Sequence, residues 1–147
     1  MTRPAWVAPA TFVLALAGIG VSAYLTIVHY ASSKLLVCSA SGVVNCEQVI
    51  TSRQSVFLGI PVAVIGIGWF AAMAVLCSPR AWRSGSHGVE LARLVAVVAG
   101  IGFVLWLVYA ELFLIGAICL WCTVAHLAAF ALFCLILLYG RAPAPAE

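Results

Sequence analysis

Charged residues are scarce in this chain of 147 residues, and that scarcity sets its broad class. Only 7% of the residues are charged, 66% are hydrophobic and the mean hydropathy is +1.22. Soluble domains carry about 25% charged residues, so the composition excludes a soluble globular protein. The sequence therefore indicates an integral membrane protein.

Four apolar runs are long enough to cross a membrane as helices, which takes about 20 residues for a hydrocarbon core of about 30 Å. Each run is apolar all round rather than along one stripe, so we expect the helices to face lipid or one another. We predict an all-α integral membrane fold, a four-transmembrane-helix bundle in a single domain over residues 1–147. The expected spans are about 9–31, 57–77, 91–113 and 119–140, and a loop occupies 32–56. A cleaved signal peptide is the alternative for the first run, which however continues through Ile27 and Val28.

The distribution of basic residues predicts the orientation of this bundle. With four spans, both termini and the loop between the second and third spans share one side of the membrane. That side carries five basic residues, Arg3, Arg80, Arg83, Arg93 and Arg141, against Lys34 and Arg53 on the other. The positive-inside rule then predicts cytoplasmic termini and an outward-facing 32–56 loop. The net charge of +3 is thus explained by topology, and we expect no nucleic-acid partner.

Four of the six cysteines fall at the predicted outer face, in two pairs. Cys38 and Cys46 lie in the loop, and Cys119 and Cys122 open the fourth span. Disulfides form and persist on that oxidising side of a membrane. The C-x-x-C pair also lies at a helix start, where backbone amides stabilise a thiolate, so it is suited to redox cycling.

The spacing of the cysteines weighs against other uses of them. Seven residues separate Cys38 from Cys46, whereas zinc sites usually place two to four between paired ligands, so we predict no metal site. Haem attachment is excluded because Thr123, not histidine, follows Cys122. A pair of static structural disulfides remains an alternative. The two other cysteines, Cys77 and Cys134, are expected to be small buried hydrophobes.

Taken together, these motifs resemble the vitamin K epoxide reductase family in its bacterial form. The resemblance covers about residues 18–133 and rests on Cys38, Cys46, Ser52, the Gly59-Ile60-Pro61 turn and Cys119-x-x-Cys122. It implies a multi-pass protein of the bacterial cytoplasmic (inner) membrane, with an extracytoplasmic loop capping a pocket for a quinone cofactor, menaquinone or ubiquinone.

The resemblance also implies a function and an order of electron transfer. Bacterial members are similar in reoxidising a secreted thioredoxin-like (DsbA-type) protein, which puts disulfides into exported proteins. Because the chain ends at Glu147, we expect this partner to be a separate protein. Electrons would pass from the partner to Cys38, from Cys46 to Cys119, and from Cys122 to the membrane quinone pool.

The expected quinone contacts form a second set of candidate site residues. They are Cys122, His126, Ser52, Glu111 and Val62. His126 stands where animal members resemble one another in having tyrosine, and Val62 follows Pro61 where many bacterial members have asparagine. Each polar candidate has a plainer interpretation: a helix cap for Ser52, interfacial solvation for Glu111, and a bond to a backbone carbonyl for His126. His29, at the outer end of the first span, is expected to be solvated.

Three other functions remain open. A DsbB-type oxidase performs the same chemistry with four helices, but its C-x-x-C lies in the first outer loop, so the order is reversed here. Reduction of vitamin K quinone or epoxide is a second alternative. A non-enzymatic membrane scaffold stapled by disulfides is the third.

Overall fold

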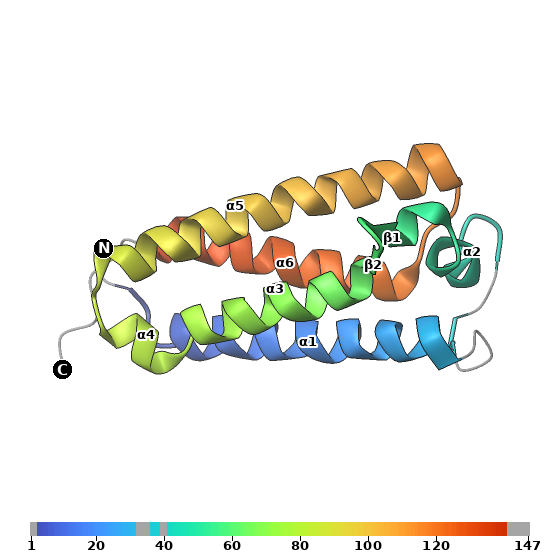
Figure 1. Ribbon diagram of the computed structural model, residues 1–147. Coiled ribbons are helices and arrows are strands. Elements are labelled where there is room, and N and C mark those ends of the chain that lie inside the picture. Colours follow the sequence, from blue (N-terminus) through green and yellow to red (C-terminus); the bar gives the residue numbers. More distant parts are fainter. Residues whose placement is uncertain (1–2, 32–35, 39–40, 141–147) are drawn as a thin grey trace.

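The computed structural model describes residues 3–31, 36–38 and 41–140, so the orientation evidence from Lys34 and Arg141 lies outside the described residues. Among these residues, helices run side by side along the molecule (Figure 1). The long axis is formed by α1 (Val7–Ala31), α3 (Val62–Leu76), α5 (His87–Tyr109) and α6 (Leu120–Tyr139). At one end lie α2 (Cys46–Ile50), the 3-10 turn η2 (Arg53–Ser55) and the strands β1 (Val56–Phe57) and β2 (Ile60–Pro61). At the other end lies α4 (Pro79–Arg83), and a π-helical turn, η3 (Ala110–Ile115), prolongs α5.

Three of the described helical segments are long and apolar enough to cross a membrane. They are Val7–Ala31, His87–Ile115 and Leu120–Tyr139. The third predicted span therefore begins four residues earlier than expected and ends two residues later. The protein is thus a mostly helical membrane protein with long apolar helices.

The prediction of a helix over 57–77 is wrong at its start. Residues 56–61 form a short antiparallel hairpin, and α3 begins only at Val62. Leu58 and Gly59 have φ angles of 52° and 83°, in the left-handed region that ends helices. Pro61 in turn disfavours helical geometry at Ile60. With 15 residues, α3 is about 22 Å long at 1.5 Å per residue.

Two aromatic rings of α3 fill the middle of the bundle, and each rests on a glycine of another helix. Trp69 donates its Nε1–H to the carbonyl of Ala96 on α5, at 2.9 Å. A Cβ atom on Gly100 would overlap the Trp69 ring, and one on Gly18 of α1 would overlap Phe70. These two glycines therefore allow α3 to approach both of its neighbours.

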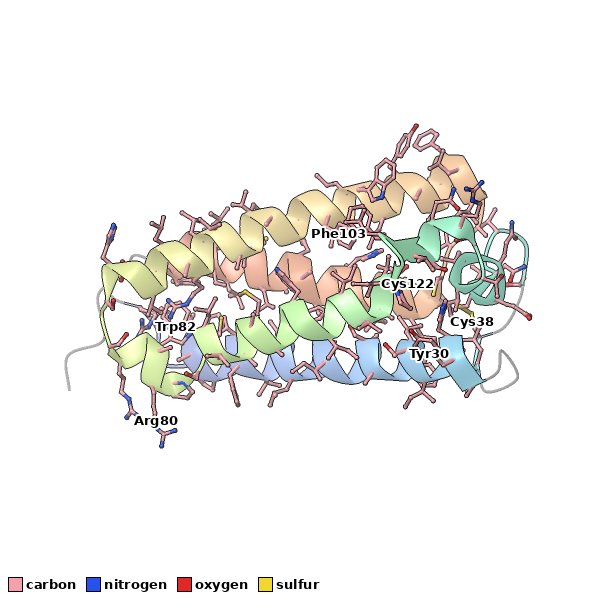
Figure 2. The ribbon with its side chains drawn as sticks, in the orientation of Figure 1. Tyr30, Cys38, Arg80, Trp82, Phe103 and Cys122 are labelled. Atoms are coloured by element: carbon pink, nitrogen blue, oxygen red, sulfur yellow. A yellow bond between two sulfur atoms is a disulfide. The ribbon has the colours of Figure 1, made fainter. Side chains whose placement is uncertain are left out.

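A buried aromatic and basic cluster closes the end that carries α4. Trp82 lies at this end of the bundle (Figure 2), and the guanidinium groups of Arg3 and Arg93 lie 4.5 and 3.7 Å from its ring centroid. Arg93 donates to the carbonyl of Leu76, the last residue of α3, from Nε and Nη2 at 3.1 and 2.8 Å. Trp82 donates its Nε1–H to Thr11 Oγ1 at 3.1 Å. Arg3 and Arg93 thus tie α4, α3 and α5 together at this end.

The close fit at Gly100 predicts a stability effect. Gly100→Ala should destabilise the protein by about 1–3 kcal/mol, because the added methyl forces the Trp69 ring out of its place. Gly102→Ala on the same helix is the matched control. A Cβ there meets no atom within 4 Å, so this change should leave stability unchanged or raise it by up to about 1 kcal/mol. Thermal unfolding in detergent measures both, and equal melting temperatures would contradict the packing account.

Candidate active site

A short backbone pairing joins the cysteine loop to the segment that precedes α6. Ile118 donates its N–H to the carbonyl of Val43 at 2.8 Å, and Asn45 donates its N–H to the carbonyl of Ile118 at 3.1 Å. The pairing has the form of a parallel bridge between Val44 and Ile118. Because Cys46 follows one side of this bridge and Cys119 follows the other, the two cysteines are brought into one cluster.

Cys46 is the first residue of α2, and the start of that helix is held firmly. The Asn45 side chain caps the helix by accepting the N–H of Gln48 at 3.1 Å. The Gln48 side chain donates to the carbonyl of Ile115, in the turn that leads toward α6, at 3.1 Å. Cys46 is only 1% exposed as a result.

The other arm of the loop is held by two aromatic side chains. Trp121 donates its Nε1–H to the carbonyl of Val37 at 3.0 Å, and Val37 donates its N–H to the Tyr24 hydroxyl at 2.9 Å. The rings of Tyr24 and Trp121 contact each other, with centroids 4.9 Å apart. Cys38 follows Val37 and forms a disulfide with Cys46, across a Cα–Cα distance of 6.2 Å. Cys38 is more exposed than Cys46.

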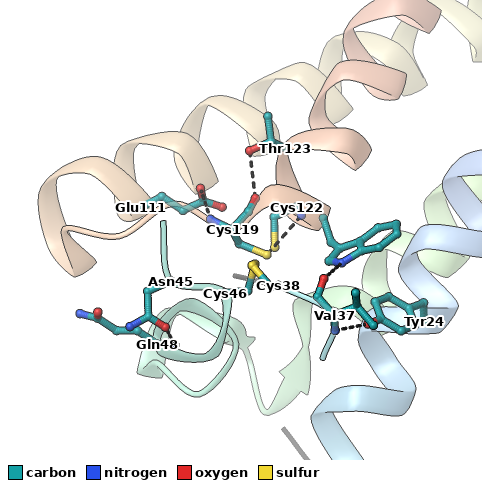
Figure 3. Close-up of a disulfide and its surroundings, with 11 residues drawn as sticks. Tyr24, Val37, Cys38, Asn45, Cys46, Gln48, Glu111, Cys119, Cys122 and Thr123 are labelled. Carbon is teal, nitrogen blue, oxygen red and sulfur yellow. Dashed lines mark hydrogen bonds between the residues drawn. A yellow bond between two sulfur atoms is a disulfide. The ribbon is translucent and has the colours of Figure 1, made fainter. Parts of the chain in front are cut away.

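Cys119 and Cys122 are free thiols at the start of α6, beside this disulfide (Figure 3). Cys119 is the N-cap residue, and its Sγ accepts the N–H of Cys122 at 3.3 Å. A hydrogen bond from the Cys122 thiol lowers the pKa of the Cys119 thiol below its usual range. Cys119 is fully buried in the cluster that contains Cys46, whereas Cys122 lines a cavity.

Glu111 supplies the carboxylate nearest to these thiols among the described residues that line the cavity. It lies in η3, is 6% exposed, and accepts the N–H of Cys119 on Oε2 at 3.4 Å. The Glu111 side chain is therefore buried, which disagrees with its plainer interpretation as a group solvated at the membrane interface.

The cavity lies between α1, α3, α5 and α6 and has a volume of about 250 Å³. Trp69, Phe70 and Phe103 contribute aromatic surface to it, while Cys122 and Glu111 line it with polar groups. Small-molecule sites are typically apolar clefts of about 300–1,000 Å³ with a few convergent polar groups, so this cavity lies just below that range in volume and resembles such sites in its lining. An apolar ring that carries hydrogen-bonding oxygens, as in a quinone head group, fits this set of residues.

The other predicted quinone contacts also line the cavity. Ser52, Val62 and His126 all belong to its wall. The Ser52 hydroxyl donates to the carbonyl of Val49 at 2.7 Å, so it is partly engaged in local structure. His29, which was expected to be solvated, is half-buried and also lines the cavity. Its position within an apolar span could have predicted a place at a cavity, because ionisable groups in such spans tend to face cavities.

The remaining cysteines lie apart from this site. Cys77 caps the C-terminus of α3 and is fully buried in the cluster near Trp82. Cys134 lies on α6 and is half-buried. Neither belongs to the apolar cluster that holds the other four cysteines.

A helical membrane protein with a disulfide and a dithiol beside an apolar cavity has the parts of a membrane thiol oxidoreductase. The model of the vitamin K epoxide reductase family matches residues 9–137, most of the chain. The protein therefore belongs to that family, whose members are oxidoreductases that couple thiols to quinones. The resemblance identified from the sequence motifs is confirmed.

The hydrogen bond between the two thiols predicts how Cys119 titrates. Cys122→Ala removes the thiol donor, so the pKa of Cys119 should rise and its thiolate should form only at higher pH. Cys122→Ser keeps a donor and should preserve more of the low pKa. A pH titration of thiolate absorbance compares these variants with Cys134→Ala, which should leave the Cys119 midpoint unchanged. An unshifted midpoint in Cys122→Ala would show that the hydrogen bond does not set this pKa.

Proposed function

We propose that the protein is a membrane thiol-disulfide:quinone oxidoreductase that reoxidises a secreted thioredoxin-like partner of the DsbA type. It would thereby drive disulfide formation in exported proteins. One observation carries the proposal: the Cys38–Cys46 disulfide and the Cys119, Cys122 thiols share one apolar cluster, and Cys122 also lines the cavity. A relay needs both contacts, whereas a static scaffold needs neither.

The first exchange occurs at Cys38. As the more exposed member of its pair, it accepts the thiolate of the reduced partner. The S–S bond to Cys46 breaks, and the second thiol of the partner then releases Cys38. The result is an oxidised partner and a reduced loop pair.

The second exchange crosses from Cys46 to Cys119. The Cys46 thiolate attacks an oxidised Cys119–Cys122 pair at Cys119, and Cys122 leaves as a thiolate. Cys38 then attacks Cys46, which frees Cys119 and restores the loop disulfide. A loop disulfide beside free thiols at Cys119 and Cys122 is the state reached at this point.

The cavity is the site of the final transfer. Cys122, His126, Glu111, Ser52 and Val62 would hold the cofactor, menaquinone or ubiquinone. A quinone bound there supplies an acceptor for two electrons and two protons. Cys122 lines the same cavity among mostly apolar side chains, where its sulfur would face such a group.

We propose that the chain is a single four-helix domain in which α3 is the second span, in addition to the three long apolar helices. Although α3 is short, the exposed apolar side chains of the preceding hairpin, Val56, Phe57, Leu58 and Ile60, extend its apolar surface. The segment around α2 would cap the cavity outside the membrane. The exposed Arg80 and Arg83 on α4 favour a cytoplasmic location for that end and for both termini, in a bacterial cytoplasmic membrane.

Turnover tests the proposed reaction. Purified protein given a reduced thioredoxin-like protein and a soluble quinone should oxidise the partner and form quinol, followed by thiol loss and quinone absorbance. Cys122→Ser should reduce turnover to background, because the relay then lacks the thiol that faces the cavity. Cys134→Ala, on the same helix, should keep turnover. Full activity in Cys122→Ser would exclude the relay.

Labelling of intact cells tests the orientation. Two exposed arginines at opposite ends of the bundle, Arg53 and Arg83, form a matched pair. Arg53→Cys should react with a membrane-impermeant thiol reagent added to intact cells, since the loop faces outward. Arg83→Cys should react only after the membrane is permeabilised. The reverse pattern would invert the topology and remove the extracytoplasmic relay.

A further inference from the structure

Several titratable side chains line the cavity, and one of them is bonded to the C-x-x-C segment. Among the described residues this set comprises Cys122, Glu111, His126 and His29. Glu111 accepts the N–H of Cys119 at 3.4 Å and lies beside that cysteine (Figure 3). It therefore contacts the cavity and the C-x-x-C segment at once.

The π-helical turn is what directs this carboxyl group inward. In η3, Ala110 and Glu111 are buried, whereas Leu112, Phe113 and Leu114 are exposed. The turn ends at Gly116, whose φ of 70° is left-handed, and Ala117 then donates its N–H to the Glu111 carbonyl at 3.1 Å. Glu111 is thus fixed by its own backbone to the segment that leads into α6.

Two acidic groups accept the backbone N–H groups at the start of α6. Glu111 accepts the Cys119 N–H, and Cys119 Sγ accepts the Cys122 N–H. Both groups thus accept N–H groups of the same short segment, and a carboxylate and a thiolate there would repel each other, more strongly in an interior of low dielectric than in water. Loss of the thiol proton therefore favours a protonated Glu111, which couples the two groups.

We propose that Glu111 carries protons from the C-x-x-C dithiol to the ligand in the cavity, an inference that rests on the proposed function. In each turnover the S–S bond between Cys119 and Cys122 forms, and two electrons and two protons leave the pair. Both electrons and both protons reach the quinone, which becomes a quinol. Glu111 receives a thiol proton, gives it to a ligand oxygen and returns to its starting state, and it does so once for each of the two protons.

The surroundings of Glu111 offer few competing groups. Among the described residues that line the cavity, the other titratable side chains are His29 of α1 and Cys122 and His126 of α6. The described residues of α2, η2 and α3 that line it carry no charge. Of the two histidines, neither has a hydrogen bond to the C-x-x-C segment among the described contacts.

Glu111→Gln tests this proposal, because glutamine keeps the size and a carbonyl acceptor but carries no transferable acid proton. Turnover with the soluble quinone should fall by about 100-fold, within the range that positioned acid-base groups contribute. Its dependence on pH should also weaken. Glu90→Gln, at the opposite end of the same helix, is the matched control and should keep the rate of the parent protein.

Two measurements made without added quinone complete the test. Fully oxidised Glu111→Gln should still oxidise its partner in a rapid burst, which shows that the variant is folded and that thiol exchange is intact. Infrared difference spectra between the oxidised and reduced protein should contain a carboxyl C=O band in the parent protein and in Glu90→Gln, and lack it in Glu111→Gln.

The outcomes separate the two proposals. A parent protein that does not reduce quinone overturns the proposed function itself. If the parent protein turns over and Glu111→Gln has the same rate, pH profile and carboxyl band, only the role of Glu111 is overturned. If Glu111→Gln is slow and also fails to oxidise its partner in a burst, Glu111 acts in thiol exchange or folding. That result likewise overturns proton transfer by Glu111.

Discussion

The backbone pairing of residues 43–45 with Ile118 is the constraint on which the site depends. Two hydrogen bonds join a polar loop to the segment that opens α6, so Cys46 and Cys119 become neighbours although they are far apart in sequence. Such a pairing is made by the main chain and tolerates changes of side chain. In the proposed relay it would hold Cys46 and Cys119 close together, as exchange between their sulfur atoms requires.

Burial orders the four sulfur atoms along one route. Cys38 is half-buried, Cys46 and Cys119 are almost completely buried, and Cys122 lines the cavity. The two middle cysteines are thus shielded from solvent thiols, and in the proposed relay each outer one would meet a different reaction partner. The start of α6 adds amide donors that stabilise negative charge on sulfur or carboxylate at this point.

The sequence was informative where the structure depends on local hydropathy and spacing. The positions of α1 and α6 follow from apolar runs, and the cysteine motifs were sufficient for the family. The start of α3 was placed too early because the hairpin residues are as apolar as a span, and only Gly59 and Pro61 mark the break. The pairing at Ile118 and the inward direction of Glu111 arise from contacts between distant segments and a π-helical turn, which hydropathy does not encode.

The central claim is that Cys46 and Cys119 exchange directly, and trapping their mixed disulfide tests it most directly. In Cys38→Ala, Cys46 has lost the neighbour that resolves the bond, so a Cys46–Cys119 disulfide should accumulate while Cys122 stays a free thiol. Peptide mapping under non-reducing conditions identifies the linked cysteines. A Cys46–Cys122 link would contradict the assigned roles of the C-x-x-C pair, and the absence of any link between the pairs would contradict the relay.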